Sequence, residues 1–208
     1  MTDYSTFKLT ITEWANRQDW SDALVASFIT MAEQKFNQEL RVDRMLQFDD
    51  GIVTTRCAEL PDDWLAFDLV RMASSQGPDG FVPVRYKSRD EFFNLTDKNA
   101  TNYYTIMGRT LYFGGPPDAI NGVEYKLSYY GEVPTFSDAT PSWIYTKYPS
   151  LYLFAALIHS DLHAVGEESQ AANMKALVED QIQKLNAAHL AAKASGSRVT
   201  RTIVRSFG

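Results

Sequence analysis

The fold is decided by residues 123–166, which read VEYKLSYYGEVPTFSDATPSWIYTKYPSLYLFAALIHSDLHAVG. Residues 124–130 are rich in aromatic side chains and predict a strand, and residues 131–139 form a polar elbow behind it. After a short turn that ends at Pro149, residues 151–158 are apolar in unbroken succession. A helix over these residues has no solvent face, so other elements must surround it. We therefore expect this helix at the centre of the fold.

Two helices are predicted near the start of the sequence. A short one covers residues 11–17, with Thr10 or Thr12 as its N-cap. A longer one covers residues 22–40, where apolar residues recur at steps of three and four. Ser21 fits the N-cap of this second helix, and the charge of Asp22 suits the positive end of a helix dipole. The second helix is therefore predicted to be amphipathic.

From residue 48 the apolar period changes toward two, which is typical of strands. The predicted strands are residues 52–58, 67–74, 81–87, 103–107, 110–113 and 124–130. Gly108 and Arg109 fit a two-residue hairpin turn, and residues 49–51 (Asp-Asp-Gly) read as another turn. Residues 88–95 favour a short helix capped by Ser88, with Phe92 and Phe93 pointing inward. This region predicts an antiparallel β-meander or a small sandwich.

The sequence closes with a helical pattern over residues 167–192 and a basic segment that follows it. We expect residues 195–197 (Ser-Gly-Ser) to end the helix. In residues 198–208 (RVTRTIVRSFG) basic or hydroxyl side chains then alternate with apolar ones, which suits residues 194–208 as an arm that adds as a strand to another chain. A disordered basic terminus is the alternative that the pattern leaves open. The candidate binding residues of this arm are Arg198, Val199, Arg201, Ile203, Val204, Arg205 and Phe207.

Together these elements predict an α+β fold: a helical bundle, made of a long N-terminal helix and two C-terminal helices, with an inserted β domain and an extended C-terminal arm. We place the N-terminal helices of the bundle in residues 1–47 and the inserted β domain in residues 48–132. The C-terminal helices of the bundle follow in residues 133–193, and the arm covers residues 194–208.

Charge is unevenly distributed along the 208 residues. The net charge is −6, although residues 191–208 hold four basic residues and no acidic one. The rest of the chain is acidic, and we do not expect it to bind nucleic acid, because such binding depends on Lys and Arg that neutralise phosphates. No segment approaches the ~20 apolar residues of a membrane span, so we expect neither a secreted nor a membrane protein.

Candidate chemistry is sparse. His159 and His163 are four residues apart on the central helix, with Asp161 between them, which is the spacing of a zinc-binding HExxH motif. Position 160 is Ser, however, and two ligands do not complete a tetrahedral site. No phosphate-binding glycine loop or nucleophile elbow is present, so we expect no enzymatic activity and no cofactor. A metal hydrolase built on these three residues is kept as a minor hypothesis.

Aromatic side chains are frequent between residues 103 and 152, and they allow two interpretations. Aromatic residues are favoured in sandwich cores and at subunit interfaces, which is the interpretation we prefer. The second is a carbohydrate-binding or tail-spike-associated β module, in which Tyr103 and Tyr112 would contact the glycan.

Three segments together resemble the adaptor, or head-completion, proteins of tailed bacteriophages. They are residues 28–46, with a helix that ends in Leu40-Arg41; residues 60–65 (LPDDWL); and residues 127–157, with their strand, elbow, Trp and Tyr-rich helix. Their order and spacing follow the family over about residues 22–190. The family often has Asn before the Trp, whereas this chain has Ser142 before Trp143, which puts a cap contact at that position in question.

The resemblance implies a structural protein of the virion neck, assembled in the host cytoplasm. It implies a homo-oligomeric ring, taken to be a dodecamer, with the portal protein on one side and tail or neck proteins on the other. DNA would pass through the channel without specific binding. The family's motifs are structural, so no catalytic residue is carried over.

Overall fold

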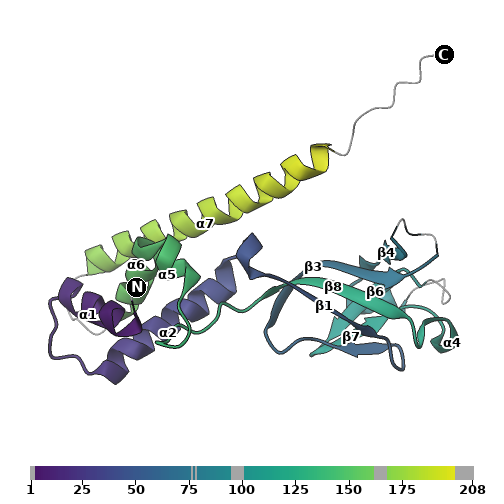
Figure 1. Ribbon diagram of the computed structural model, residues 1–208, viewed down its shortest axis with the longest axis horizontal. Coiled ribbons are helices and arrows are strands. Elements are labelled where there is room, and N and C mark those ends of the chain that lie inside the picture. The colour runs from purple at the N-terminus through teal and green to yellow at the C-terminus, as the bar shows by residue number, and fades with distance from the viewer. Residues whose placement is uncertain (1–2, 76, 78, 95–100, 162–167, 200–208) are drawn as a thin grey trace, which may run out of the picture. The chain divides into compact units, whose positions relative to one another are not determined.

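The computed structural model describes residues 3–75, 77, 79–94, 101–161 and 168–199, and gives the backbone alone for residues 161, 168–170 and 196–199. The fold is α+β, as the sequence predicts (Figure 1). The chain divides into two compact units: unit 1 comprises residues 1–43 and 133–208, and unit 2 comprises residues 44–132.

The helices in the described part are α1 (Tyr4–Trp14), α2 (Asp22–Glu39), α3 (Arg89–Phe93), α4 (Pro117–Ile120), α5 (Trp143–Lys147), α6 (Pro149–Asp161) and α7 (Glu168–Val199), with a 3₁₀ turn at Asp43–Met45. The strands are β1 (Leu46–Ile52), β2 (Cys57–Glu59), β3 (Trp64–Ala73), β4 (Phe81–Pro83), β5 (Arg85–Tyr86), β6 (Tyr103–Met107), β7 (Thr110–Phe113) and β8 (Glu124–Gly131). No helix among the described residues is long and apolar enough to cross a bilayer.

Helix α6 lies at the centre of unit 1. It packs against α1, α2, α5 and α7, and its residues Leu151, Tyr152, Ala155 and Ala156 are fully buried. The continuous apolar run therefore has the role that its sequence predicts, because a helix without a polar face must be covered on all sides.

An aromatic cluster surrounds Tyr152 in the core of unit 1. The centroid of its ring lies 5.0 Å from that of Phe7, 5.2 Å from that of Phe36 and 5.9 Å from that of Phe136. These residues come from α6, α1, α2 and the segment between β8 and α5. Tilted and edge-on pairs at such distances add about 0.5–1.5 kcal/mol each beyond their burial, so the cluster joins all four segments.

Helix α1 begins earlier than predicted. The expected helix over residues 11–17 is wrong, because Asp3 caps a helix that already starts at Tyr4. The Asp3 carboxylate accepts a hydrogen bond from the Thr6 amide at 2.6 Å. Helix α2, in contrast, starts after its predicted cap, since the Ser21 hydroxyl accepts a hydrogen bond from the Leu24 amide at 3.3 Å.

Helix α7 ends later than predicted. The expected break at residues 195–197 is not observed, and the helix runs through them to Val199. The Ser195 hydroxyl donates to the Ala192 carbonyl at 2.8 Å, a bond made within the helix itself. One glycine costs a helix only about 1 kcal/mol relative to alanine, so Gly196 does not stop it. Arg198 and Val199, predicted as part of an extended arm, therefore belong to α7.

Unit 2 consists of two four-stranded sheets with the strand orders β1-β8-β3-β4 and β2-β7-β6-β5. The pairs between the described strands are antiparallel except β5 with β6, which is parallel. The prediction of a purely antiparallel insertion is thus wrong at this one pair. The reason is that residues 81–87 form two short strands, β4 and β5, which belong to different sheets.

Both sheets of unit 2 contribute to one apolar core. Val70, Met72 and Leu127 enter it from the first sheet, and Leu111 and Phe113 enter it from the second. Two sheets that share a core form the small sandwich that was one of the two predicted arrangements.

The first strand of unit 2 is displaced from its predicted position. Residues 49–51, read as a turn, lie inside β1, and the predicted strand over residues 52–58 is interrupted by a turn in which Thr55 and Arg56 have positive φ. Gly51 is opposite Tyr125 in the register, and a Cβ on Gly51 would lie 2.7 Å from the Tyr125 hydroxyl. The glycine therefore makes room for a buried tyrosine and does not mark a turn.

The predicted helix at residues 88–95 is confirmed as α3. Ser88 and Glu91 form a capping box at its start, in which each side chain bonds the other residue's amide. Phe92 is buried as expected, but Phe93 is 63% exposed, so its predicted inward orientation is wrong. Two consecutive helical residues point about 100° apart, and only one of them faces the core.

Candidate interaction surfaces

The predicted arm lies largely outside the described residues. Arg198 and Val199 are in the backbone of α7, whereas Arg201, Ile203, Val204, Arg205 and Phe207 fall in residues 200–208, which the structure does not describe. What the structure does define is the helix to which this segment is attached.

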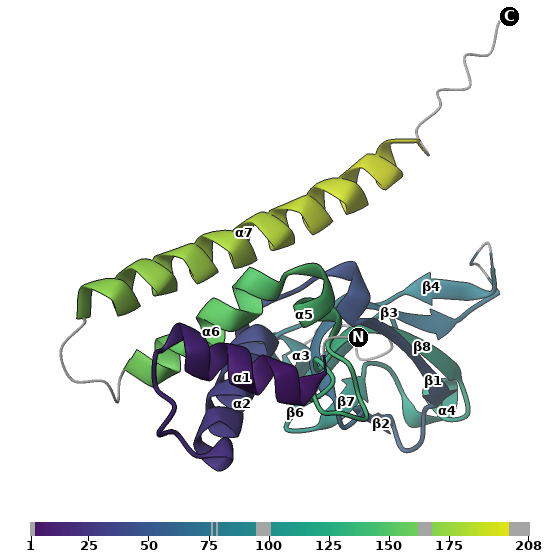
Figure 2. The ribbon, with the colours of Figure 1, turned by 60° about the vertical axis from the view of Figure 1, so that its left-hand side comes forward.

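The last part of α7 is exposed to solvent. Residues 190–195 are all exposed, and Leu190 is 62% accessible although it is apolar. Figures 1 and 2 both show this part of α7 extending past the other helices of unit 1. A helix end with an exposed leucine that projects from its own core is suited to contact another chain.

Two side chains of α7 hold the segment that follows α2. Asn186 accepts a hydrogen bond from the Arg41 amide at 2.7 Å and donates one to the Glu39 carbonyl at 2.8 Å. His189 is buried, and its Nδ1 lies 2.8 Å from the Asp43 carboxylate. Asn186 thereby gives a partner to the Glu39 carbonyl, which lies in the last turn of α2 and has no partner within the helix, and it joins α7 to this segment.

Unit 2 has an open edge and an exposed apolar row. Among the residues that the structure describes, strand β1 is the terminal strand of its sheet. On the outer face of this sheet, Phe48 is 81% exposed and Leu69 is 41% exposed, and both are opposite Ser128 in the register. Ile52 on the same face of β1 is 61% exposed. Exposed apolar side chains next to an unpaired edge mark a surface for other chains.

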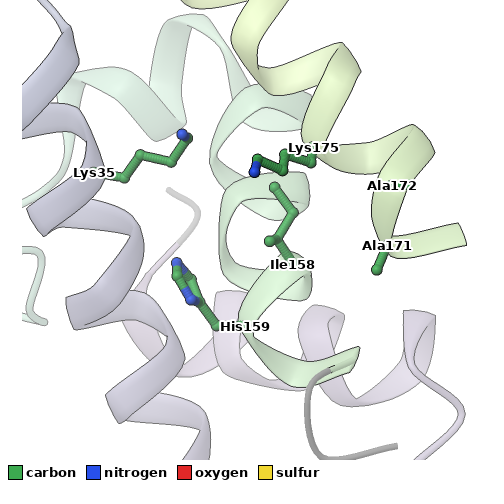
Figure 3. A pocket seen from close by; sticks show the side chains of 6 residues that line it. All are labelled: Lys35, Ile158, His159, Ala171, Ala172 and Lys175. Carbon is green, nitrogen blue, oxygen red and sulfur yellow. The ribbon is translucent and has the colours of Figure 1, made fainter. Parts of the chain in front are cut away.

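A cavity of about 340 Å³ lies between α2, α6 and α7. Its lining in the described part of the chain is Lys35, Ile158, His159, Ala171, Ala172 and Lys175. Figure 3 shows the side chains of Lys35 and Lys175 extending toward one another from α2 and α7. Each ammonium group also approaches a glutamate on its own helix, Glu39 at 2.7 Å and Glu179 at 4.0 Å.

This cavity does not favour the metal-site hypothesis. The Nε2 atom of His159 is buried without a hydrogen-bond partner in the described residues, and burial, followed by the charge of Lys35, lowers the pKa of His159. Two lysines beside a histidine repel a metal cation. The Asp161 side chain and His163 lie outside the described residues, and the rest of the described chain holds no cluster of three His, Cys, Asp or Glu that could bind a metal.

The aromatic residues fit the core interpretation better than the carbohydrate one. Seven of the aromatic residues between positions 103 and 152 are buried: Tyr104, Phe113, Tyr125, Tyr129, Tyr130, Phe136 and Tyr152. Tyr103 and Tyr112, the two proposed glycan contacts, are only half-buried, and the ammonium group of Lys87 lies 5.5 Å from the ring centroid of Tyr103.

The described part of the chain has three exposed features that are suited to contacts with other chains: a projecting helix, an open sheet edge and accessible apolar side chains. Comparison with known families agrees. The family model described as SU10 adaptor protein matches residues 2–204, nearly the whole chain, so the chain belongs to this family of phage head-to-tail adaptor proteins. The family resemblance drawn from the sequence is thereby confirmed. No curated protein matched the chain.

Proposed function

We propose that this protein forms the adaptor ring between the portal and the tail of a tailed phage and encloses a channel through which DNA passes. The observation that carries the proposal is the family match, which covers residues 2–204 and therefore nearly the whole chain. The ring is a closed homo-oligomer, which we take to be a dodecamer. It is a component of the virion and acts without catalysis.

The exposed surfaces support assembly into a ring. A closed ring of identical subunits uses head-to-tail contacts, which require two different complementary surfaces on each subunit. The chain offers such surfaces in both units: Leu9 and Trp14 on α1, each more than 60% exposed, and Phe48 and Ile52 on β1. In this proposal the helices of unit 1 form the bundle of the ring subunit, and unit 2 is the β domain inserted in it.

The net charge supports passage of DNA rather than its binding. A protein of net charge −6 lacks the excess of cations that holds a duplex by neutralising its phosphates. An acidic channel wall repels the duplex and lets it slide. We expect no retardation of double-stranded DNA by the assembled protein in a gel at physiological salt.

The residues beyond α7 contact the portal in this proposal. Arg201 and Arg205 pair with acidic groups of the portal, while the backbone of the segment adds as a strand. The helix that precedes them extends past the other helices of unit 1 (Figure 1).

A truncation tests the portal contact. A variant that ends at Val199 keeps all of α7 and should fold with an unchanged circular dichroism spectrum. We expect it to lose binding to purified portal complexes in a co-sedimentation assay. The matched control is Lys8→Ala, which removes a basic side chain paired with Asp22 at 2.6 Å in unit 1 and should leave portal binding intact. Equal portal binding by the truncated variant and the full chain would refute the arm assignment.

A further inference from the structure

Strand β1 offers backbone groups for a further strand. The amide of Val53 donates to the Val123 carbonyl at 3.0 Å, and the Val53 carbonyl accepts from the Gly122 amide at 2.9 Å, so both groups of Val53 face the β8 side. Successive residues of an antiparallel strand alternate in this direction. The register from Leu46 to Ile52 has no shift. The N–H and C=O groups of Phe48, Asp50 and Ile52 therefore point to the open edge.

The side chains of these three residues form a defined pattern. They share the outer face of the sheet because alternate residues of a strand point to the same side. Phe48 and Ile52 are 81% and 61% exposed, and Asp50 between them is exposed as well. Lys126, the residue opposite Asp50, lies 4.1 Å from the ring centroid of Phe81. The side chains of Phe48, Asp50 and Ile52 along this edge are therefore apolar, acidic and apolar in turn.

A segment of this chain has the complementary pattern. Residues 203–207 are Ile-Val-Arg-Ser-Phe, so that Ile203, Arg205 and Phe207 alternate as apolar, basic, apolar. In an antiparallel pairing Ile203 would be opposite Ile52, Arg205 opposite Asp50, and Phe207 opposite Phe48. Opposite charges and apolar pairs directly across two strands each contribute about 0.2–1 kcal/mol.

The pattern disfavours the simplest alternative occupant, a second β1 strand. Two β1 strands paired about Asp50 would bring two carboxylates directly opposite each other, which destabilises a sheet. A basic strand removes this repulsion and also covers the exposed apolar side chains. A strand bound at the β1 edge also prevents this edge from pairing with unrelated chains.

We propose that residues 203–207 of one copy add as a fifth strand to β1 of a second copy while the portal is absent. The proposal rests on the proposed function, because it uses the same segment as a strand donor. In the free protein the acceptor is a neighbour's β1 edge, and in the assembled neck the acceptor is the portal. Residues 203–207 therefore stay paired with β1 of a neighbouring copy until the portal replaces that strand as their partner.

Hydrogen exchange of the full chain without portal tests the pairing. The amides of Phe48, Asp50 and Ile52 should exchange at least about tenfold more slowly in the full chain than in the variant that ends at Val199. Asp50→Lys and Arg205→Asp should each abolish this protection, and the double variant Asp50→Lys/Arg205→Asp should restore it. Glu59→Lys, the same charge change on the exposed edge strand β2, is the matched control and should leave β1 protected.

A mixing experiment separates a second copy from the chain's own segment. Isotopically labelled protein that ends at Val199 keeps an acceptor edge, and unlabelled Asp50→Lys protein keeps a donor segment. Mixing them should slow exchange at β1 of the labelled copy. Slow exchange in the full chain without any effect of mixing would show pairing within one chain and would overturn the proposal, as would equal exchange in the full and truncated chains. Portal binding that persists in either case would leave the proposed function standing.

Discussion

The carboxylate of Glu33 and the hydroxyl of Tyr152 meet at 2.7 Å inside unit 1, and the same Glu33 oxygen accepts the Phe136 amide at 2.7 Å. The three residues come from α2, from α6 and from the segment that precedes α5. Glu33 is 6% exposed and Tyr152 is fully buried. A buried carboxylate is tolerated here because it is hydrogen-bonded to both other segments.

Tyr152→Phe should destabilise unit 1 by about 1–3 kcal/mol, because it removes one of two partners from a buried carboxylate. The ring and its stacking would stay. Urea denaturation followed by circular dichroism measures this change. Tyr145→Phe, in the same aromatic cluster, is the control and should have a smaller effect. Equal effects of the two substitutions would contradict the role given to the Tyr152 hydroxyl.

Glu33→Gln should change how stability depends on pH. Burial raises the pKa of Glu33 above its ordinary value of 4.5, and the hydrogen bonds from Phe136 and Tyr152 oppose this only in part. A folded-state pKa above that of the unfolded chain means that the folded state holds its proton longer. The contribution of Glu33 is therefore fully present below pH 4.5 and is lost as pH rises through the folded pKa.

The glutamine variant keeps an acceptor oxygen and has no charge, so its stability relative to the wild type should improve as pH is raised from 4.5 to 7. Urea titrations at several pH values measure this difference. Glu132→Gln, at an exposed position, is the control and should give a constant difference. If the stability difference between Glu33→Gln and the wild type were also constant with pH, a raised pKa of Glu33 would be ruled out.

Asn186→Ala should release the segment after α2 from α7. The substitution leaves the Arg41 amide and the Glu39 carbonyl without their partner, at a cost of about 1–3 kcal/mol. Hydrogen exchange should accelerate at the Arg41 amide first. The control is Asn173→Ala at an exposed site of α7, where no such change is expected. Unaltered exchange at Arg41 in Asn186→Ala would show that the contact is not stabilising.

Gly51→Ala should destabilise unit 2 by about 1–3 kcal/mol through overpacking. The new Cβ would lie 2.7 Å from the Tyr125 hydroxyl and 2.9 Å from the ring carbon that bears it. Thermal unfolding measures the loss. The double variant Gly51→Ala/Tyr125→Phe removes the closest atom and should recover part of it. No recovery would indicate that the glycine is needed for another reason.

The elements that were predicted correctly are those in which the local sequence signals and the tertiary environment favour the same structure. Helix α6 is apolar on all sides and central, and α2 and α3 begin at the hydroxyl caps that their sequences show. Strands β6 and β7 flank the predicted turn at Gly108, which has φ of 63°. In each of these cases the residues that set the structure are neighbours along the chain.

The predictions failed where the structure of a segment depends on a residue that is far away in the sequence. The sequence around Gly51 resembles a turn. Glycine is required there because Tyr125, which lies far along the chain and opposite Gly51 in the sheet, leaves no room for a Cβ. Gly196 resembles a helix terminator, yet the helix continues at a small cost. The anchoring role of Asn186 has no signal in the sequence, because its partners, Glu39 and Arg41, lie at the end of a different helix and just beyond it. Of the candidate arm, five of seven residues lie outside the described chain, and their role stays a prediction.

In our proposal the chain assembles into a closed ring that binds the portal. Native mass spectrometry of the purified full chain, alone and with portal, tests whether this ring forms. We expect a single closed oligomer, a dodecamer, bound as one ring to each portal complex. A chain that remains monomeric at all concentrations and adds no mass to the portal would contradict it.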